Sequence, residues 1–337
     1  SYIVRQDMRL NPEHPPLMKD LAGLGALAWS KLSGRPINFP EQIKAWREDL
    51  NGQWDFGFNF LYQSGNDARK MIFWGRFPLI LLTIILGLYI FKWARQLFGN
   101  RTALLALVLF ALSPTFIAHG RLVTTDVAAS LAIFVGLYYF VRWLKNPSWK
   151  KLIAAGIFFG LAQLMKFSVF LLLPLFIFLA ISWIIAQRLE SKKDFVLDKD
   201  RSFLRLIVKY LGGLVLITAI GYIFIVGPAY QYHVWHYEKQ KQTTDTEEIL
   251  STYAGGPAEN GLGTCLSFRG LSRCPAEIVT WMSGQPILRA WAQYGLGLLM
   301  VTQRSAGGNT TYFLGQINNT GWWYYFPLTI LFKTPIA

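Results

Sequence analysis

Long apolar stretches alternate with short polar segments along most of the chain, and several approach the length of a membrane-crossing helix. About 20 apolar residues are needed to cross a bilayer as a helix. Six such segments are predicted, near 72–94, 102–118, 124–144, 149–165, 167–187 and 206–227. The 102–118 and 149–165 segments are short, which favours a re-entrant or strongly tilted course for one of them. A further apolar stretch begins at Trp322.

These segments predict an all-α, polytopic membrane protein, because only helices and closed barrels satisfy the backbone hydrogen-bonding groups in lipid. The predicted parts are an extracytoplasmic loop with an interfacial helix (1–71), a six-helix transmembrane region (72–227), a second extracytoplasmic loop (228–321) and the start of a further membrane or interfacial helix (322–337). Since residue 1 is Ser and the last residue lies in an apolar run, we expect an internal portion of a longer protein, with a span missing at each end.

The distribution of charge gives an orientation. The chain is 53% hydrophobic and 15% charged, with a net charge of +14. Segments 92–101, 142–151 and 188–209 carry net charges of +3, +4 and +3, and they alternate with nearly neutral segments such as 1–71 and 228–321. The positive-inside rule places the three basic segments in the cytoplasm. The positive charge is therefore a topology signal, and the spans exclude a soluble nucleic-acid-binding protein.

The two cysteines, Cys265 and Cys274, lie nine residues apart in the second outer loop. An oxidising exterior favours a disulfide between them, and two free thiols are the alternative. Two cysteines alone are too few for a structural zinc site.

The segment Asn11-Pro12-Glu13-His14-Pro15-Pro16-Leu17 is the first candidate site. Its prolines fix the backbone and delay the start of a helix until Leu17. The helix expected from Leu17 to Leu32 is too charged and short to span comfortably, so we expect it to lie along the outer membrane surface. Glu13, His14 and Lys19 are then held at the level of the lipid headgroups, either for chemistry or as solvated polar residues beside a capped helix.

The second candidate site is the outer turn that contains His119, Arg121 and Asp126. An acid inside the end of a membrane helix is costly, so it normally pairs with a cation or does chemistry. Asp126 either pairs with Arg121, five positions earlier, or positions an acceptor or a metal while Arg121 binds phosphate. Lys166, the only charged residue between Leu152 and Gln187, falls at another outer turn. It either extends to the headgroups or binds the phosphate of a lipid-linked substrate as a point charge. Arg304 and Lys333 are weaker candidates of the same kind.

Two aromatic-rich segments complete the pattern. Gly321-Trp322-Trp323-Tyr324-Tyr325-Phe326-Pro327 is typical of an aromatic belt at the outer interface. His233 and His236 lie three positions apart among aromatic residues, and without an evident third metal ligand they are interpreted as interfacial amphipathic residues.

Three strings, RLNPEHPPLMK (9–19), AHGRLVTTD (118–126) and YFLG…GWWYYFP (312–327), together resemble the bacterial glycosyltransferase family 39. Its members are similar to protein O-mannosyltransferases and lipid A aminoarabinose transferases and have the GT-C membrane fold. The resemblance implies an inverting transferase that moves a sugar from a polyprenyl phosphate to a hydroxyl acceptor (protein, lipid or glycan). It also implies a protein of the cytoplasmic membrane with its active site on the extracytoplasmic side.

The resemblance assigns roles to residues of both candidate sites. Asp126 corresponds to a second catalytic acid, whereas the main general base, an acidic residue in a first outer loop, is expected upstream of residue 1. Glu13 and His119 would line the substrate site. The cations that would offset the charge of the departing phosphate are His14, Lys19, Arg121 and Lys166. A divalent metal is compatible with such a site but is not required by the sequence.

Two other functions compete with the transferase. A transporter or flippase for a lipid-linked substrate would show repeats and charges near the bilayer midplane, whereas the polar residues here collect at one face and no repeat is visible. The other is a non-catalytic membrane subunit whose outer loop binds a partner.

Overall fold

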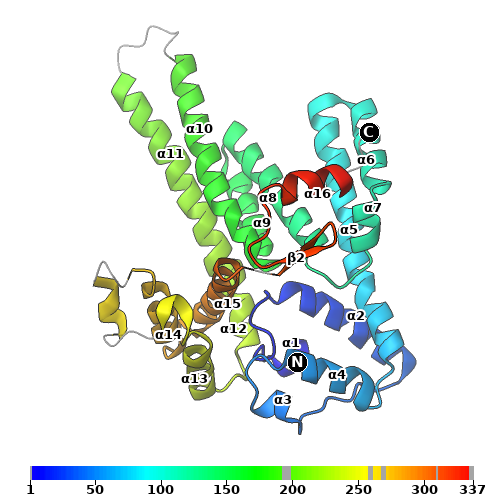
Figure 1. The fold of residues 1–337 in the computed structure, drawn as a ribbon. Helices are drawn as coiled ribbons and strands as arrows, with labels where there is room; N and C mark the ends of the chain where they lie inside the picture. Colours follow the sequence, from blue (N-terminus) through cyan, green and yellow to red (C-terminus); the bar gives the residue numbers. More distant parts are fainter. Residues whose placement is uncertain (1, 192–198, 257–260, 267–270, 309, 334–337) are drawn as a thin grey trace.

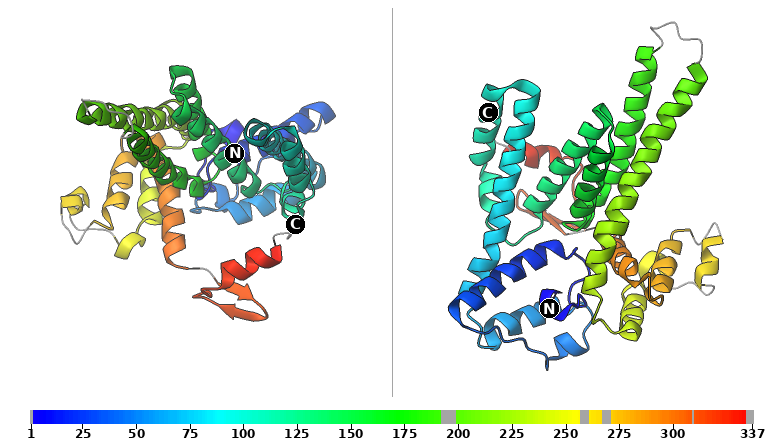
Figure 2. Two further views of the ribbon diagram at one scale, coloured as in Figure 1. Left: turned by 90° about the horizontal axis from the view of Figure 1, so that it is seen from above. Right: turned by 180° about the vertical axis from the view of Figure 1, so that it is seen from behind.

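The long apolar helices stand side by side, and the N-terminal part of the chain lies across one end of them (Figures 1 and 2). The computed structural model describes residues 2–191, 199–256, 261–266, 271–308 and 310–333. Within these residues the regular secondary structure is helical apart from one two-stranded hairpin. The prediction of an all-α membrane protein is confirmed.

Four helical stretches in the described part of the chain are long and apolar enough to cross a membrane. Two of them are single helices, α5 (Ala68–Phe98) and α8 (Asp126–Lys145). The other two are composite: Phe167–Leu189 and Phe203–His233. They are built from the 3-10 helix η2 (Phe167–Leu171) with α10 (Leu172–Ser191), and from α11 (Lys199–Ala219), the π-helix η3 (Ile220–Val226) and α12 (Gly227–His233).

The two segments that were predicted to be short are short helices. Segment 149–165 forms α9 (Trp149–Gln163). Segment 102–118 divides into α6 (Asn100–Ala111) and α7 (Pro114–His119), because a proline cannot continue a helix and forces Ser113 into an extended conformation. All six predicted segments are therefore helical, but the six-helix transmembrane region stays a prediction.

The C-terminal ends of α5, α8 and α10 and the N-terminal ends of α6, α9 and α11 lie at the same end of the helical bundle (Figure 1). The three basic segments include these helix ends, although residues 192–198 of the third segment lie outside the described residues. The arrangement agrees with the charge alternation of the sequence. The opposite end of the bundle holds the N-terminal part and the turns before Asp126 and Lys166.

Helices α8, α9, α10 and α11 share the largest apolar core. Aromatic rings occupy its centre, where Phe140 and Phe176 stack with their ring centroids 3.9 Å apart and both side chains are fully buried. Trp143 packs edge-on against Tyr210 in the same cluster. This core fixes α8 and α9, and with them the positions of Asp126 at the N-terminal end of α8 and Lys166 just after α9.

The helix α2 (Leu17–Ser33) runs across the bundle rather than along it and packs against α5 (Figure 2). Gly25 permits this contact, because a Cβ atom at this position would overlap the backbone carbonyl of Trp74. A small apolar cluster of Leu10, Ala45 and Phe56 joins the surrounding short elements. These elements are α3 (Lys44–Arg47), α4 (Gln53–Phe58) and the π-helix η1 (Asn59–Gln63). The short helix α1 (Tyr2–Arg5) packs against α2.

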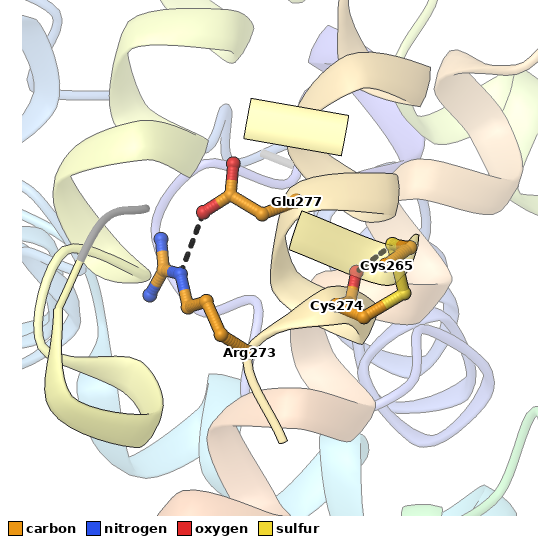
Figure 3. Close-up of a disulfide and its surroundings, with 4 residues drawn as sticks. All are labelled: Cys265, Arg273, Cys274 and Glu277. Atoms are coloured by element: carbon orange, nitrogen blue, oxygen red, sulfur yellow. Dashed lines mark hydrogen bonds and ion pairs between the residues drawn. A yellow bond between two sulfur atoms is a disulfide. The ribbon is translucent and has the colours of Figure 1, made fainter. Parts of the chain in front are cut away.

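The second outer segment, so named for its predicted side of the membrane (228–321), contains further helices, and a disulfide closes part of it (Figure 3). Cys265 and Cys274 are bonded, with their Cα atoms 4.8 Å apart. The adjacent Arg273 donates to Glu277 at 2.6 Å and to the carbonyl of Tyr253 at 2.8 Å. The elements here are α13 (Lys239–Ile249), the 3-10 helices η4 (Tyr253–Gly255) and η5 (Gly261–Leu266), α14 (Cys274–Ser283) and α15 (Arg289–Ala306).

The chain ends with an antiparallel hairpin, β1 (Thr311–Phe313) and β2 (Gln316–Asn318), followed by α16 (Tyr325–Lys333). The ring of Phe313 contacts those of Trp322 and Tyr325, whereas Trp323 is 89% exposed. This pattern leaves part of the aromatic segment available to an interface. The predicted further helix at 322–337 corresponds to α16, and residues 334–337 lie outside the described residues.

Candidate active site

The proline-rich turn from Asn11 to Pro16 is held in place by hydrogen bonds from Lys19, in the first turn of α2. The Lys19 Nζ atom donates to the carbonyl oxygens of Asn11 and His14, at 2.6 and 2.8 Å, and to the hydroxyl of Tyr2 at 3.0 Å. Prolines supply no N–H groups, so the carbonyls of such a turn need donors from elsewhere. The Lys19 ammonium satisfies that need inside the protein.

Two further contacts place this turn against the membrane helices. The backbone N–H of Leu17 donates to the carbonyl of Leu164 at 3.2 Å, at the C-terminal end of α9. On the other side Gly297 of α15 approaches closely, because a Cβ atom there would overlap the carbonyl oxygen of Pro12 and the ring of Phe167. The turn is therefore packed between α9, η2 and α15.

Asp126 and Lys166 form an ion pair in which Lys166 Nζ lies 2.7 Å from Asp126 Oδ1. Asp126 is the first residue of α8, where the helix dipole favours a negative charge. Lys166 has an extended backbone between α9 and η2, so its side chain can leave the helical packing. In the described part of the chain no ion pair joins Asp126 to Arg121, so the alternative of a local Arg121–Asp126 pair is wrong.

A cavity of about 160 Å³ brings the proline-rich turn and Lys166 together. Its polar side chains are Glu13, His14, Lys166, Ser168 and Arg304, and its apolar side chains are Phe167, Met300 and Val301. Arg304, at the end of α15, extends to within 3.4 Å of the Glu13 carboxylate. Two of the predicted phosphate-binding residues and one predicted lining residue thus share a single cavity.

The groups around this cavity influence one another electrostatically. Burial lowers the pKa of His14, and the positive charges of Lys19, Lys166 and Arg304 lower it further against the opposing effect of Glu13. The His14 imidazole is therefore neutral at pH 7 and can accept a hydrogen bond or a proton. Burial also lowers the pKa of Lys19 to about 7, while Asp20 and Glu13 act in the opposite direction.

The remaining predicted site residues lie in the turn before α8. His119 ends α7 and lies near enough to act electrostatically on Asp126. Arg121 is exposed two residues farther on. Of these two basic residues, only His119 acts on the Asp126–Lys166 pair, and neither lines the cavity.

The two histidines of the second outer segment have different surroundings. His233 is buried, and its ring nitrogens face the carbonyl of Ala229 at 2.6 Å and the carboxylate of Asp20 at 3.0 Å. His236 is exposed and contacts the carbonyl of Arg5 at 3.1 Å. The interpretation of both as interfacial residues is wrong for His233, which connects α12 to α2. Within the described residues, no three His, Cys, Asp or Glu side chains gather in a way that could hold a metal ion.

Arg304 is the cavity residue that the sequence indicated least clearly. It lies 291 positions after Glu13, and no motif relates the two. Its signal was a single basic residue in the last turn of α15, an otherwise amphipathic helix. Only the packing of α15 against the proline-rich turn reveals its place.

Comparison with known proteins identifies part of the chain. Residues 68–197 match the model of a family described as dolichyl-phosphate-mannose-protein mannosyltransferase. The resemblance to a GT-C mannosyltransferase family is confirmed. The matched segment includes Asp126 and Lys166, and the family implies membrane glycosyltransferase activity of the GT-C type. No curated protein and no solved structure matches the chain.

Proposed function

We propose that the protein transfers a sugar from a polyprenyl phosphate to a hydroxyl acceptor, with inversion, on the extracytoplasmic side of the membrane. The observation that carries this proposal is the cavity that unites Lys166, His14 and Arg304 beside the Asp126 carboxylate. Its volume of about 160 Å³ suits a small polar headgroup rather than a large soluble ligand. The family match to mannosyltransferases supports mannose as the first donor to test.

An apolar groove supports a lipid-linked donor. A second cavity, of about 80 Å³, lies between α5, α8 and α9 and is lined by apolar side chains and Tyr89. Its lining includes Met165, the residue directly before Lys166. A polyprenyl chain in this groove would bring its phosphate to the Lys166 ammonium.

The proposed reaction requires a favourable place for the negative charge of the leaving group. The acceptor oxygen attacks the anomeric carbon, and the bond between that carbon and the phosphate oxygen breaks with its electron pair going to the phosphate. The acceptor proton passes to a base. Lys166 and Arg304 would stabilise the departing phosphate, because cations placed where negative charge develops lower the energy of the transition state. Asp126 would hold Lys166 in position and orient the acceptor hydroxyl.

The test is transfer of labelled mannose from a polyprenyl-phosphate donor by the full protein in proteoliposomes. We expect Asp126→Ala to abolish transfer and Lys166→Met to reduce it by at least a hundredfold, with folding intact. Lys31→Met, which removes an exposed lysine at the far end of α2, is the matched control and should retain activity. Wild-type transfer by both site variants would overturn the proposal.

A further inference from the structure

The ammonium group of Lys19 is fully engaged inside the protein. Its three acceptors are the carbonyls of Asn11 and His14 and the hydroxyl of Tyr2, at 2.6 to 3.0 Å. The same ammonium lies 4.5 Å from the centre of the Tyr2 ring. Because a lysine ammonium has three N–H donors, these contacts use all of its hydrogen-bonding capacity.

Lys19 is also separate from the cavity that holds the candidate donor site. The described residues that line this cavity include Glu13 and His14 but not Lys19. The two carbonyls that Lys19 binds flank Glu13 along the chain, one on either side. A displacement of these carbonyls would therefore move the side chains of Glu13 and His14.

From these contacts we infer that Lys19 is a positioning residue for the donor site. By binding the carbonyls of Asn11 and His14, it holds the turn that presents Glu13 and His14 to the cavity. The inference rests on the proposed function of that cavity. It replaces direct phosphate binding by Lys19 with an indirect role.

The surroundings of Lys19 support this role. Tyr2 of α1 binds the carbonyl of Asn11 from a second direction, at 3.1 Å. Asp20, the next residue of α2, is bound by the buried His233 of α12. The charged or titratable groups around Lys19 are thus Tyr2, Glu13, His14, Asp20 and His233. Tyr2, Asp20 and His233 tie the first turn of α2 to α1 and α12. Because Lys19 lies in this fixed helical turn, its hydrogen bonds hold the proline-rich turn in one position.

A double-mutant cycle separates positioning from direct binding, because residues that act through one another show non-additive effects. Lys19→Met is made in the wild type and in a Glu13→Ala, His14→Ala background, and kcat/KM for the polyprenyl-phosphate-mannose donor is measured. In the wild type we expect a loss of about tenfold or more. In the background the same substitution should change kcat/KM by less than about twofold, because the side chains that Lys19 positions are absent.

Two outcomes would overturn the inference. A repeated tenfold loss in the background would show direct contact with the donor and overturn it, as would an unchanged kcat/KM for Lys19→Met in the wild type. If Lys19→Met does not fold, Lys19→Gln is taken through the same cycle, since its amide keeps two donors. Lys31→Met is the control for loss of a lysine from α2. Absence of any transfer by the wild type would instead overturn the proposed function.

Discussion

Lys166 donates a hydrogen bond of 2.7 Å to the carboxylate of Asp126, although 40 positions separate the two residues. Both side chains are partly exposed, so the pair alone contributes little to stability, roughly 0–1 kcal/mol. The proposed role of the pair is instead to hold the Lys166 ammonium beside the cavity. The exchanged variant Asp126→Lys, Lys166→Asp tests this view. We expect its melting temperature to fall only slightly, because a lysine replaces the acid favoured at the start of α8. Sugar transfer should be lost, because the cation has moved away from the donor site and the carboxylate no longer orients the acceptor.

A wild-type rate in the exchanged variant would mean that only the ion pair matters. A large fall in its melting temperature would mean that the pair is chiefly structural. Thermal unfolding in detergent and transfer in proteoliposomes separate these outcomes.

The contact between His233 and Asp20 should stabilise the placement of α2. Both ring nitrogens of His233 face acceptors, the Ala229 carbonyl and the Asp20 carboxylate. His233 is buried, and loss of one partner would leave the other without its bond. His233→Ala should therefore reduce stability by about 3 kcal/mol. His236→Ala is the matched control, because His236 is exposed, and it should melt close to the wild type.

Lys19 gives the stability of the protein a defined dependence on pH. Burial lowers its pKa to about 7 in the folded state, against about 10.4 in an unfolded chain. Between pH 7 and pH 10, Lys19 binds a proton in the unfolded state but largely loses it in the folded state. Its contribution to the free energy of unfolding therefore rises as the pH increases over this range. Lys19→Met should remove this rise, which is measured as the melting temperature between pH 7 and 9.5. An identical pH dependence in the variant and the wild type would contradict the prediction.

The sequence predicted the helices better than their contacts. All six apolar segments are helical, because length and hydropathy are local properties. The division of segment 102–118 has a local signal too, namely Pro114. Helix length and the proline break could thus be read before any packing was known.

The partners of the site residues had no such signal. Spacing suggested Arg121 as the partner of Asp126, but the packing of α8 against α9 supplies Lys166 instead. Lys19 binds backbone carbonyls, and because every residue has one, the sequence does not show which carbonyls it binds. Contacts between distant parts of the chain determine which cations line the cavity and which, like Lys19, position the residues that line it.

The disulfide and Arg273 should stabilise the second outer segment together. A bond between residues nine apart restricts the unfolded chain by about 2–3 kcal/mol. Arg273 is buried and binds the carbonyls of Leu250 and Tyr253 (Figure 3 shows its bond to Glu277). We expect the double variant Cys265→Ser, Cys274→Ser to be cleaved faster by protease in this segment than the wild type. Equal cleavage rates would contradict a stabilising role.

Arg304 and Glu13 should affect phosphate binding in opposite directions. They face each other at 3.4 Å within the candidate donor site, and Arg304 is the more exposed of the two. A phosphate would be attracted by Arg304 and repelled by Glu13. Arg304→Gln should therefore weaken inhibition of transfer by polyprenyl phosphate about tenfold, whereas Glu13→Gln should strengthen it. Inhibition constants measured at low and high salt check both signs, because screening reduces each effect at this exposed position. Changes of the same sign in the two variants would place the phosphate elsewhere.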